Sequence, residues 1–195
     1  MFSKKGFVTV CLVILAALLI TGCAPTTPMP MPVAVGDSYG GGIVAYILVN
    51  GDTGYDPSVQ HGLIAATADQ STGIQYGSNV VTGATGIAIG TGQANTTAIV
   101  TIQGAGSYAA QLCNDLTEGG YDDWFLPSKD ELDKLYTNRV AIGDFVDDLT
   151  EDEYWSSSES NVDSKWYAWC QHFDAGLQAT YSKPDMLRVR AVRAF

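Results

Sequence analysis

The chain has 195 residues, of which 21 are acidic and 10 are basic, so its formal charge is −11. An acidic surface repels phosphate and sulfate groups, which argues against nucleic acids and sulfated polysaccharides as partners. The length suits one domain of ordinary size with a hydrophobic core of its own.

The N-terminal stretch has the features of a bacterial secretory signal. Lys4 and Lys5 precede an apolar run over residues 7–20, and this run is too short to span a bilayer with ease. The run ends at Ile20-Thr21-Gly22-Cys23, which resembles the lipobox at which bacterial lipoproteins are cleaved and lipidated. The alternative is an ordinary signal peptide with a chance cysteine at position 23.

We therefore predict three parts in the chain. Residues 1–22 form a lipoprotein signal peptide, residues 23–35 form a tether that holds four of the seven prolines, and residues 36–195 form one folded domain. Removal of the signal leaves 8 basic and 21 acidic side chains, a formal charge of −13. Lipid on Cys23 would anchor the protein to a membrane of the cell envelope. Ala24, in place of an aspartate, resembles the sorting pattern for the outer membrane or cell surface.

The first part of the domain predicts strands and irregular loops. Residues 36–50 predict a glycine-led strand, and residues 62–66 predict a second, shorter strand. Residues 71–106 are rich in Gly and Thr and show no helical period, so we expect loops with brief strands such as Ala98–Ile102. These loops either cover the core or face a ligand.

The middle of the domain predicts two helices joined by a rigid corner. Residues 107–116 predict a helix with one buried face. In the corner, residues 119–127, glycines and aspartates make a turn and the Trp124 segment enters the core. Ser128 opens the second helix, and Glu131 follows at the spacing of a capping box.

The last third of the chain predicts strands with short turns between them. Their ranges are residues 154–158, 166–173, 177–181 and 187–195. A helical middle with strands on both sides predicts an α+β fold with mainly antiparallel pairing.

Six short segments carry a resemblance to one known family: Gly-Gly-Ile-Val (41–44), His-Gly-Leu-Ile-Ala-Ala (61–66), the corner (119–128), Tyr-Trp-Ser-Ser-Ser-Glu (154–159), the aromatic strand (166–169) and Val-Arg-Ala-Val-Arg (189–193). In this order they resemble the Lcl C-terminal domain family, which is similar in fold to C-type lectins and formylglycine-generating enzymes. The resemblance implies a loop-rich, C-type-lectin-like domain with two helices packed on a twisted antiparallel sheet, whose first and last strands pair. The chain lacks the collagen repeat of the adhesins for which the family is named.

The residues that most often carry catalysis show no catalytic pattern. His61 and His172 lie far apart in the sequence, without the spacing of a catalytic triad or a zinc site. Cys113 and Cys170 remain in the mature domain, where they predict either a disulfide or two core thiols. Resemblance to formylglycine-generating enzymes would imply a third role for paired cysteines, the binding of copper.

Two further patterns suggest ligands but have simpler explanations. Carboxylates at residues 144–153 and in the loops, Asp122 and Asp123 among them, could bind calcium, but their spacing fits no known calcium loop. We therefore expect solvated charge and turn formation, with calcium as the alternative. Residues 104–109 fit the G-x-G-x-x-A pattern, but no parallel strand follows the predicted helix, so we predict no dinucleotide cofactor.

The aromatic strand favours a binding function. Residues 166–173 carry aromatic side chains on both faces, so we expect one aromatic face to be partly exposed. We predict a non-catalytic, lipid-anchored module that binds a glycan or an envelope protein. The alternatives are a metal- or cysteine-dependent enzyme on a formylglycine-generating-enzyme-like scaffold and a structural envelope subunit. The candidate ligand-binding residues are Asp122, Asp123, Trp124, Glu159 and Asn161.

The lipobox prediction can be checked on the native protein. We expect Cys23 to carry lipid and residues 1–22 to be absent, because the lipobox directly follows the apolar run. Mass spectrometry of the native N-terminal peptide measures both. An unmodified cysteine, or cleavage at another residue, would show that the signal is of the ordinary kind.

Overall fold

The computed structural model describes residues 32–146 and 152–195. The predicted signal peptide and residues 23–31 of the predicted tether, Cys23 among them, lie outside the described residues. Within the described ranges, no helix combines the length and the apolar character needed to cross a membrane.

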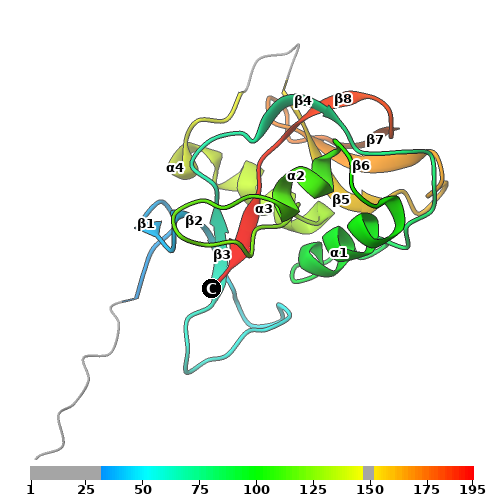
Figure 1. The fold of residues 1–195 in the computed structure, drawn as a ribbon. Coiled ribbons are helices and arrows are strands. Elements are labelled where there is room, and N and C mark those ends of the chain that lie inside the picture. Colours follow the sequence, from blue (N-terminus) through cyan, green and yellow to red (C-terminus); the bar gives the residue numbers. More distant parts are fainter. Residues whose placement is uncertain (1–31, 147–151) are drawn as a thin grey trace, which may run out of the picture. The chain divides into compact units, whose positions relative to one another are not determined.

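The strands form two sheets (Figure 1). All strand pairs are antiparallel except β5 with β8, which are parallel. In spatial order, the first sheet contains β1 (Ser38–Tyr39), β2 (Gly42–Ile47), β3 (Gly62–Ala65) and β9 (Val192–Ala194), and the second contains β4 (Ser71–Gln75), β8 (Met186–Val189), β5 (Glu153–Glu159), β6 (Tyr167–His172) and β7 (Gln178–Ser182).

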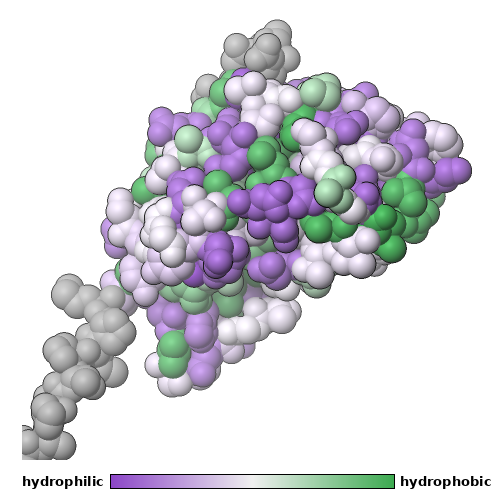
Figure 2. All heavy atoms as spheres, in the orientation of Figure 1, coloured by the Kyte–Doolittle hydropathy of each residue, from purple (hydrophilic) through white to green (hydrophobic). Residues whose placement is uncertain are grey.

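The helices of the described residues all lie between β4 and β5 in the sequence, and they confirm the α+β class. Helix α3 contacts β2 of the first sheet and β5 and β6 of the second, so it lies where the two sheets meet. Figure 2 shows hydrophilic side chains over much of one face, with hydrophobic ones gathered over α1. The helices are α1 (Gly92–Gln103), α2 (Ala109–Asn114), α3 (Lys129–Thr137) and α4 (Arg139–Ile142).

The segment predicted as loops with a brief strand at Ala98–Ile102 contains α1, so that prediction is wrong. Its threonines and β-branched residues favour strands by propensity, but packing decides the outcome here. Thr96 and Ile99 are fully buried, and the Thr97 and Thr101 hydroxyls donate to carbonyls four residues back along the helix. Because a helix precedes Gly104, the 104–109 segment also lacks the strand that a dinucleotide fingerprint requires.

The last strand does not pair with the first. It pairs with β3, and β2 separates β3 from β1, so the pairing implied by the family resemblance is corrected. The predicted strand 187–195 is also two strands, because the chain leaves β8 in the second sheet and enters β9 in the first. Arg190, between them, donates to the Asp69 carboxylate at 2.8 Å and is buried, which fixes this crossover.

The corner at residues 119–128 is confirmed as a structural element. Trp124 is 1 % exposed in the core, and its indole N–H donates to the Tyr121 carbonyl at 3.2 Å. Phe125 exchanges two backbone hydrogen bonds with Val192, which attaches the corner to the last strand. The Ser128–Glu131 capping box at the start of α3 is present as predicted.

Replacement of Trp124 by alanine should lower the free energy of unfolding by about 3–5 kcal/mol, because it opens a cavity in the core. Denaturant titration of the purified protein measures this change. Trp166→Ala is the matched control, since the same atoms are removed from a side chain that is 44 % exposed. Equal losses of stability in the two variants would contradict the core assignment of Trp124.

Candidate functional site

A groove of about 420 Å³ opens between the loop after β5 and the strands β6 and β7. We call it the aromatic groove. It contains one phenol and one indole beside short hydroxyl, amide and carboxylate side chains. The lining residues are Ser160, Asn161, Val162, Asp163, Tyr167, Trp169 and Thr180.

The loop that forms one side of the groove is held by its own hydrogen bonds. The Ser160 hydroxyl accepts from the Val162 N–H at 3.2 Å, and the Ser160 N–H donates to the Tyr167 carbonyl at 2.9 Å. The Asp163 carbonyl accepts from the Tyr167 N–H at 3.1 Å. The loop therefore returns directly into β6, and the Asn161 side chain stays exposed at its tip.

Aromatic surface is concentrated at this end of β6. Trp166 and Tyr167 are 44 % and 42 % exposed. They belong to opposite faces of the predicted strand 166–173, so the exposure is a property of the start of the strand and not of one aromatic face. Trp169 is half-buried, and its indole N–H is enclosed without a hydrogen-bond partner among the described residues. The ammonium of Lys129 lies 5.1 Å from the centre of the Trp169 ring. The groove thus offers apolar ring faces next to polar groups.

A buried ion pair lies directly beside the groove, at the residue before Ser160. The side chains of Glu159 and Lys183 are both fully buried, and their charged atoms are 2.6 Å apart. The Glu159 carboxylate also accepts from the Thr82 N–H and hydroxyl, each at 2.9 Å, and from the Gly83 N–H at 3.1 Å. Because both carboxylate oxygens accept hydrogen bonds and the side chain is fully buried, Glu159 is a structural residue and its assignment as a ligand-binding candidate is corrected.

The structure separates the other candidates of the sequence analysis. Asn161 lines the aromatic groove, whereas Asp122, Asp123 and Trp124 do not. Trp124 is buried in the core, so its assignment as a ligand contact is also corrected. Asp123 forms a bidentate pair with the Arg193 guanidinium at 2.6 and 2.9 Å, which lowers the pKa of its carboxyl. Asp122 is exposed in the corner.

The two cysteines are free thiols in the core, so the predicted disulfide is replaced by the alternative of two core thiols. Cys113 lies on the buried face of α2, and Cys170 lies in β6. Burial raises the pKa of both thiols, and that of Cys170 reaches about 12. Both sulfurs are therefore protonated at neutral pH and poor nucleophiles.

The two histidines occupy different places. His61 lines a second, largely apolar pocket of about 320 Å³, together with Phe195, Phe125 and Glu131. Burial raises the pKa of Glu131, although its oxygens accept from the Gly90 N–H at 2.7 Å and the Ser128 N–H at 2.7 Å. The carboxylate therefore holds the 86–92 segment to the start of α3. His172 lies at the end of β6.

The fold and the groove define a small α+β domain that presents an aromatic, polar-rimmed groove. A comparison with known families matches residues 65–193 to the Lcl C-terminal domain. This match covers well over half of the chain, and the protein belongs to the Lcl C-terminal domain family. No curated protein matches the chain.

Sequence reasoning found Asn161 and the aromatic strand but missed Asp163 and Thr180 of the groove. Asp163 lies in the same loop as Asn161, so proximity along the chain could have identified it. Thr180 reaches the groove because β7 pairs with β6, which places Thr180 opposite Trp169. That pairing register carries no signal in the sequence of either strand alone.

The assignment of free thiols predicts a specific labelling pattern. Iodoacetamide should leave Cys113 and Cys170 unmodified in the native protein and alkylate both in denaturant without a reductant, because only burial protects them. Peptide mass spectrometry reports each position separately. A Cys113–Cys170 linked peptide in the non-reduced digest would restore the disulfide.

Proposed function

We propose that this protein is a non-catalytic binding module, lipid-anchored in the bacterial envelope, whose aromatic groove binds a neutral glycan. The observation that carries the proposal is the groove itself, where Tyr167 and Trp169 stand beside Asn161 and Asp163. The C-type-lectin-like fold implied by the family resemblance is part of this proposal, as is the envelope location.

Each component of the groove suits a sugar. The C–H face of a pyranose is apolar and packs on exposed aromatic rings, such as that of Tyr167. Sugar hydroxyls need donors and acceptors at short range, which the Asn161 amide and the Asp163 carboxylate supply. Because the chain is strongly acidic, an uncharged glycan is favoured over a sulfated or phosphorylated one.

The competing enzyme hypothesis is weakened by the state of the cysteines. An enzyme that used Cys113 or Cys170 would need an accessible thiolate, and both thiols are buried with a raised pKa. The second alternative is a structural envelope subunit that binds another protein. Such a subunit would bind through a broad surface and not through a single groove. Substitutions confined to the groove therefore distinguish it from glycan binding.

The proposal is tested on an array of neutral, sulfated and phosphorylated oligosaccharides. We expect binding to neutral members, and a Kd raised at least about tenfold, or about 1.4 kcal/mol, in Tyr167→Ala and Asn161→Ala. Isothermal titration with the best neutral oligosaccharide measures the change in Kd.

Matched controls separate the groove from the surface in general. Tyr55 is 39 % exposed, close to the 42 % of Tyr167, but it lies outside the groove, and Asn50 is an exposed asparagine in a turn. Tyr55→Ala and Asn50→Ala should bind as the unchanged protein does. Absence of glycan binding, or equal losses in the control variants, would refute this function for the groove.

A further inference from the structure

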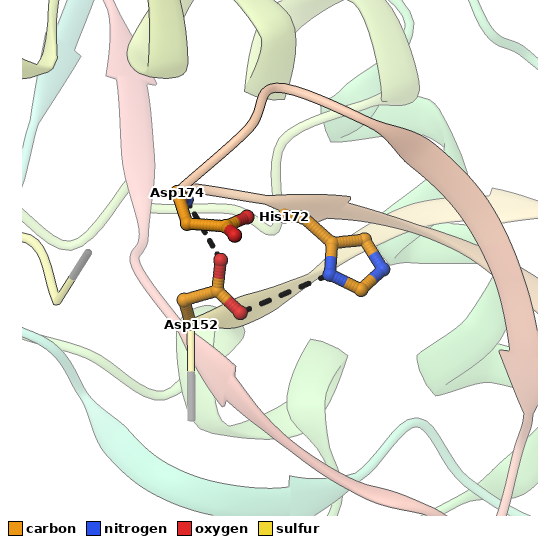
Figure 3. A group of neighbouring side chains, drawn as sticks. All are labelled: Asp152, His172 and Asp174. Atoms are coloured by element: carbon orange, nitrogen blue, oxygen red, sulfur yellow. Dashed lines mark hydrogen bonds and ion pairs between the residues drawn. The ribbon is translucent and has the colours of Figure 1, made fainter. Parts of the chain in front are cut away.

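Three potential metal ligands meet where β5 begins and β6 ends. Asp152 directly precedes β5, His172 is the last residue of β6, and Asp174 lies in the turn that leads to β7. One ligand atom from each lies within 4.8 Å of the other two. Figure 3 shows the Asp152 carboxylate between the His172 ring and the Asp174 backbone. The Asp152 and His172 atoms that face each other, Oδ1 and Nδ1, are 3.8 Å apart.

Backbone hydrogen bonds hold these residues in place. The Asp152 carbonyl accepts from the Phe173 N–H at 3.1 Å, and its carboxylate Oδ2 accepts from the Asp174 N–H at 2.7 Å. His172 is fixed from the other side, since its N–H donates to the Leu177 carbonyl at 2.9 Å. The turn after β6 is therefore closed on Asp152, which keeps the side chains of Asp152, His172 and Asp174 next to one another.

The cluster concentrates negative charge at a partly buried site. Asp152 is 1 % exposed, and Asp174 and Glu153 lie close to it. The His172 Nδ1 lies 3.8 Å from an Asp152 carboxylate oxygen and 3.7 Å from a Glu153 carboxylate oxygen. A divalent cation at this point would offset the repulsion that burial makes costly.

We propose that Asp152, His172 and Asp174 form a binding site for a divalent transition-metal ion of the zinc class. The donors are one imidazole nitrogen and two carboxylate oxygens, a mixed set that suits zinc, whereas calcium prefers oxygen ligands alone. Bonds of about 2.0–2.2 Å place tetrahedral ligands about 3.4 Å apart. The 3.8 Å between the Asp152 and His172 atoms is already close to that spacing.

The bound ion would join two segments at one end of the strands β5 and β6. Three protein ligands leave a coordination position for water, and the Glu153 carboxylate, 3.7 Å from the His172 Nδ1, lies near the point where this water would bind. The ion would thereby tie the start of β5 to the turn between β6 and β7. The site shares no residue with the aromatic groove, so it stands independently of the proposed glycan function.

The test is titration of the chelator-treated full protein with zinc chloride, followed by calorimetry and by thermal unfolding. We expect one zinc ion per chain and a rise of Tm with zinc. His172→Gln and Asp174→Asn should each raise the Kd for zinc at least about tenfold. Asp152 is left unchanged, because its carboxylate also closes the turn and its replacement could unfold the segment.

Two controls and a competing ion complete the design. His61→Gln removes the other histidine and Asp122→Asn removes an exposed aspartate of the corner; both variants should bind zinc as the unchanged protein does. Calcium should give neither heat of binding nor a shift of Tm. No zinc binding, zinc binding that survives His172→Gln, or a preference for calcium would each overturn the proposal, provided that circular dichroism shows the variants to be folded.

Discussion

The buried pair of Glu159 and Lys183 is the interaction on which the aromatic groove depends. Two opposite charges without water are stable only when their remaining hydrogen-bonding positions are filled. Glu159 fills its own with the Thr82–Gly83 segment, and Lys183 donates to the Val80 carbonyl at 2.6 Å. One pair thus joins the end of β5, the turn after β7 and a loop from the other half of the chain. The groove begins one residue after Glu159, so its shape follows from this junction.

Local chemistry in the sequence was sufficient where a few neighbouring residues decide the structure. Ser128 and Glu131 predict the start of α3 because a capping box needs only its own four residues. Local chemistry was insufficient for α1. Thr96 and Ile99 favour strands by propensity, and they become helical because they are buried against distant parts of the chain. The split of the last strand into β8 and β9 was missed for a similar reason. Arg190 reads as one more residue of an alternating strand, and its Asp69 partner lies in another part of the chain.

The same distinction applies to the sites. Asn161 and the aromatic residues of β6 could be named from the sequence, because aromatic and amide residues next to a predicted loop suggest an exposed binding surface. Glu159 looked like a surface carboxylate, and only its partner Lys183, brought in by the turn after β7, makes it a buried structural group. His172 looked isolated for the converse reason. The strand pairing that sets Glu153 opposite His172 also brings Asp152 beside it.

The pairing of β3 with β9 and of β4 with β8 has a consequence for the order in which the domain can fold during synthesis. The neighbouring strands β1 to β3 and β5 to β7 can associate as soon as each set has left the ribosome. β3 pairs with β9 and β4 pairs with β8, and both partners are among the last strands to be synthesised. The edges of β3 and β4 therefore stay unpaired until translation is nearly complete. During that interval the exposed edges can pair with other nascent chains. A chain interrupted before Met186 would therefore contain the residues of all the described helices and still leave the edges of β3 and β4 unpaired.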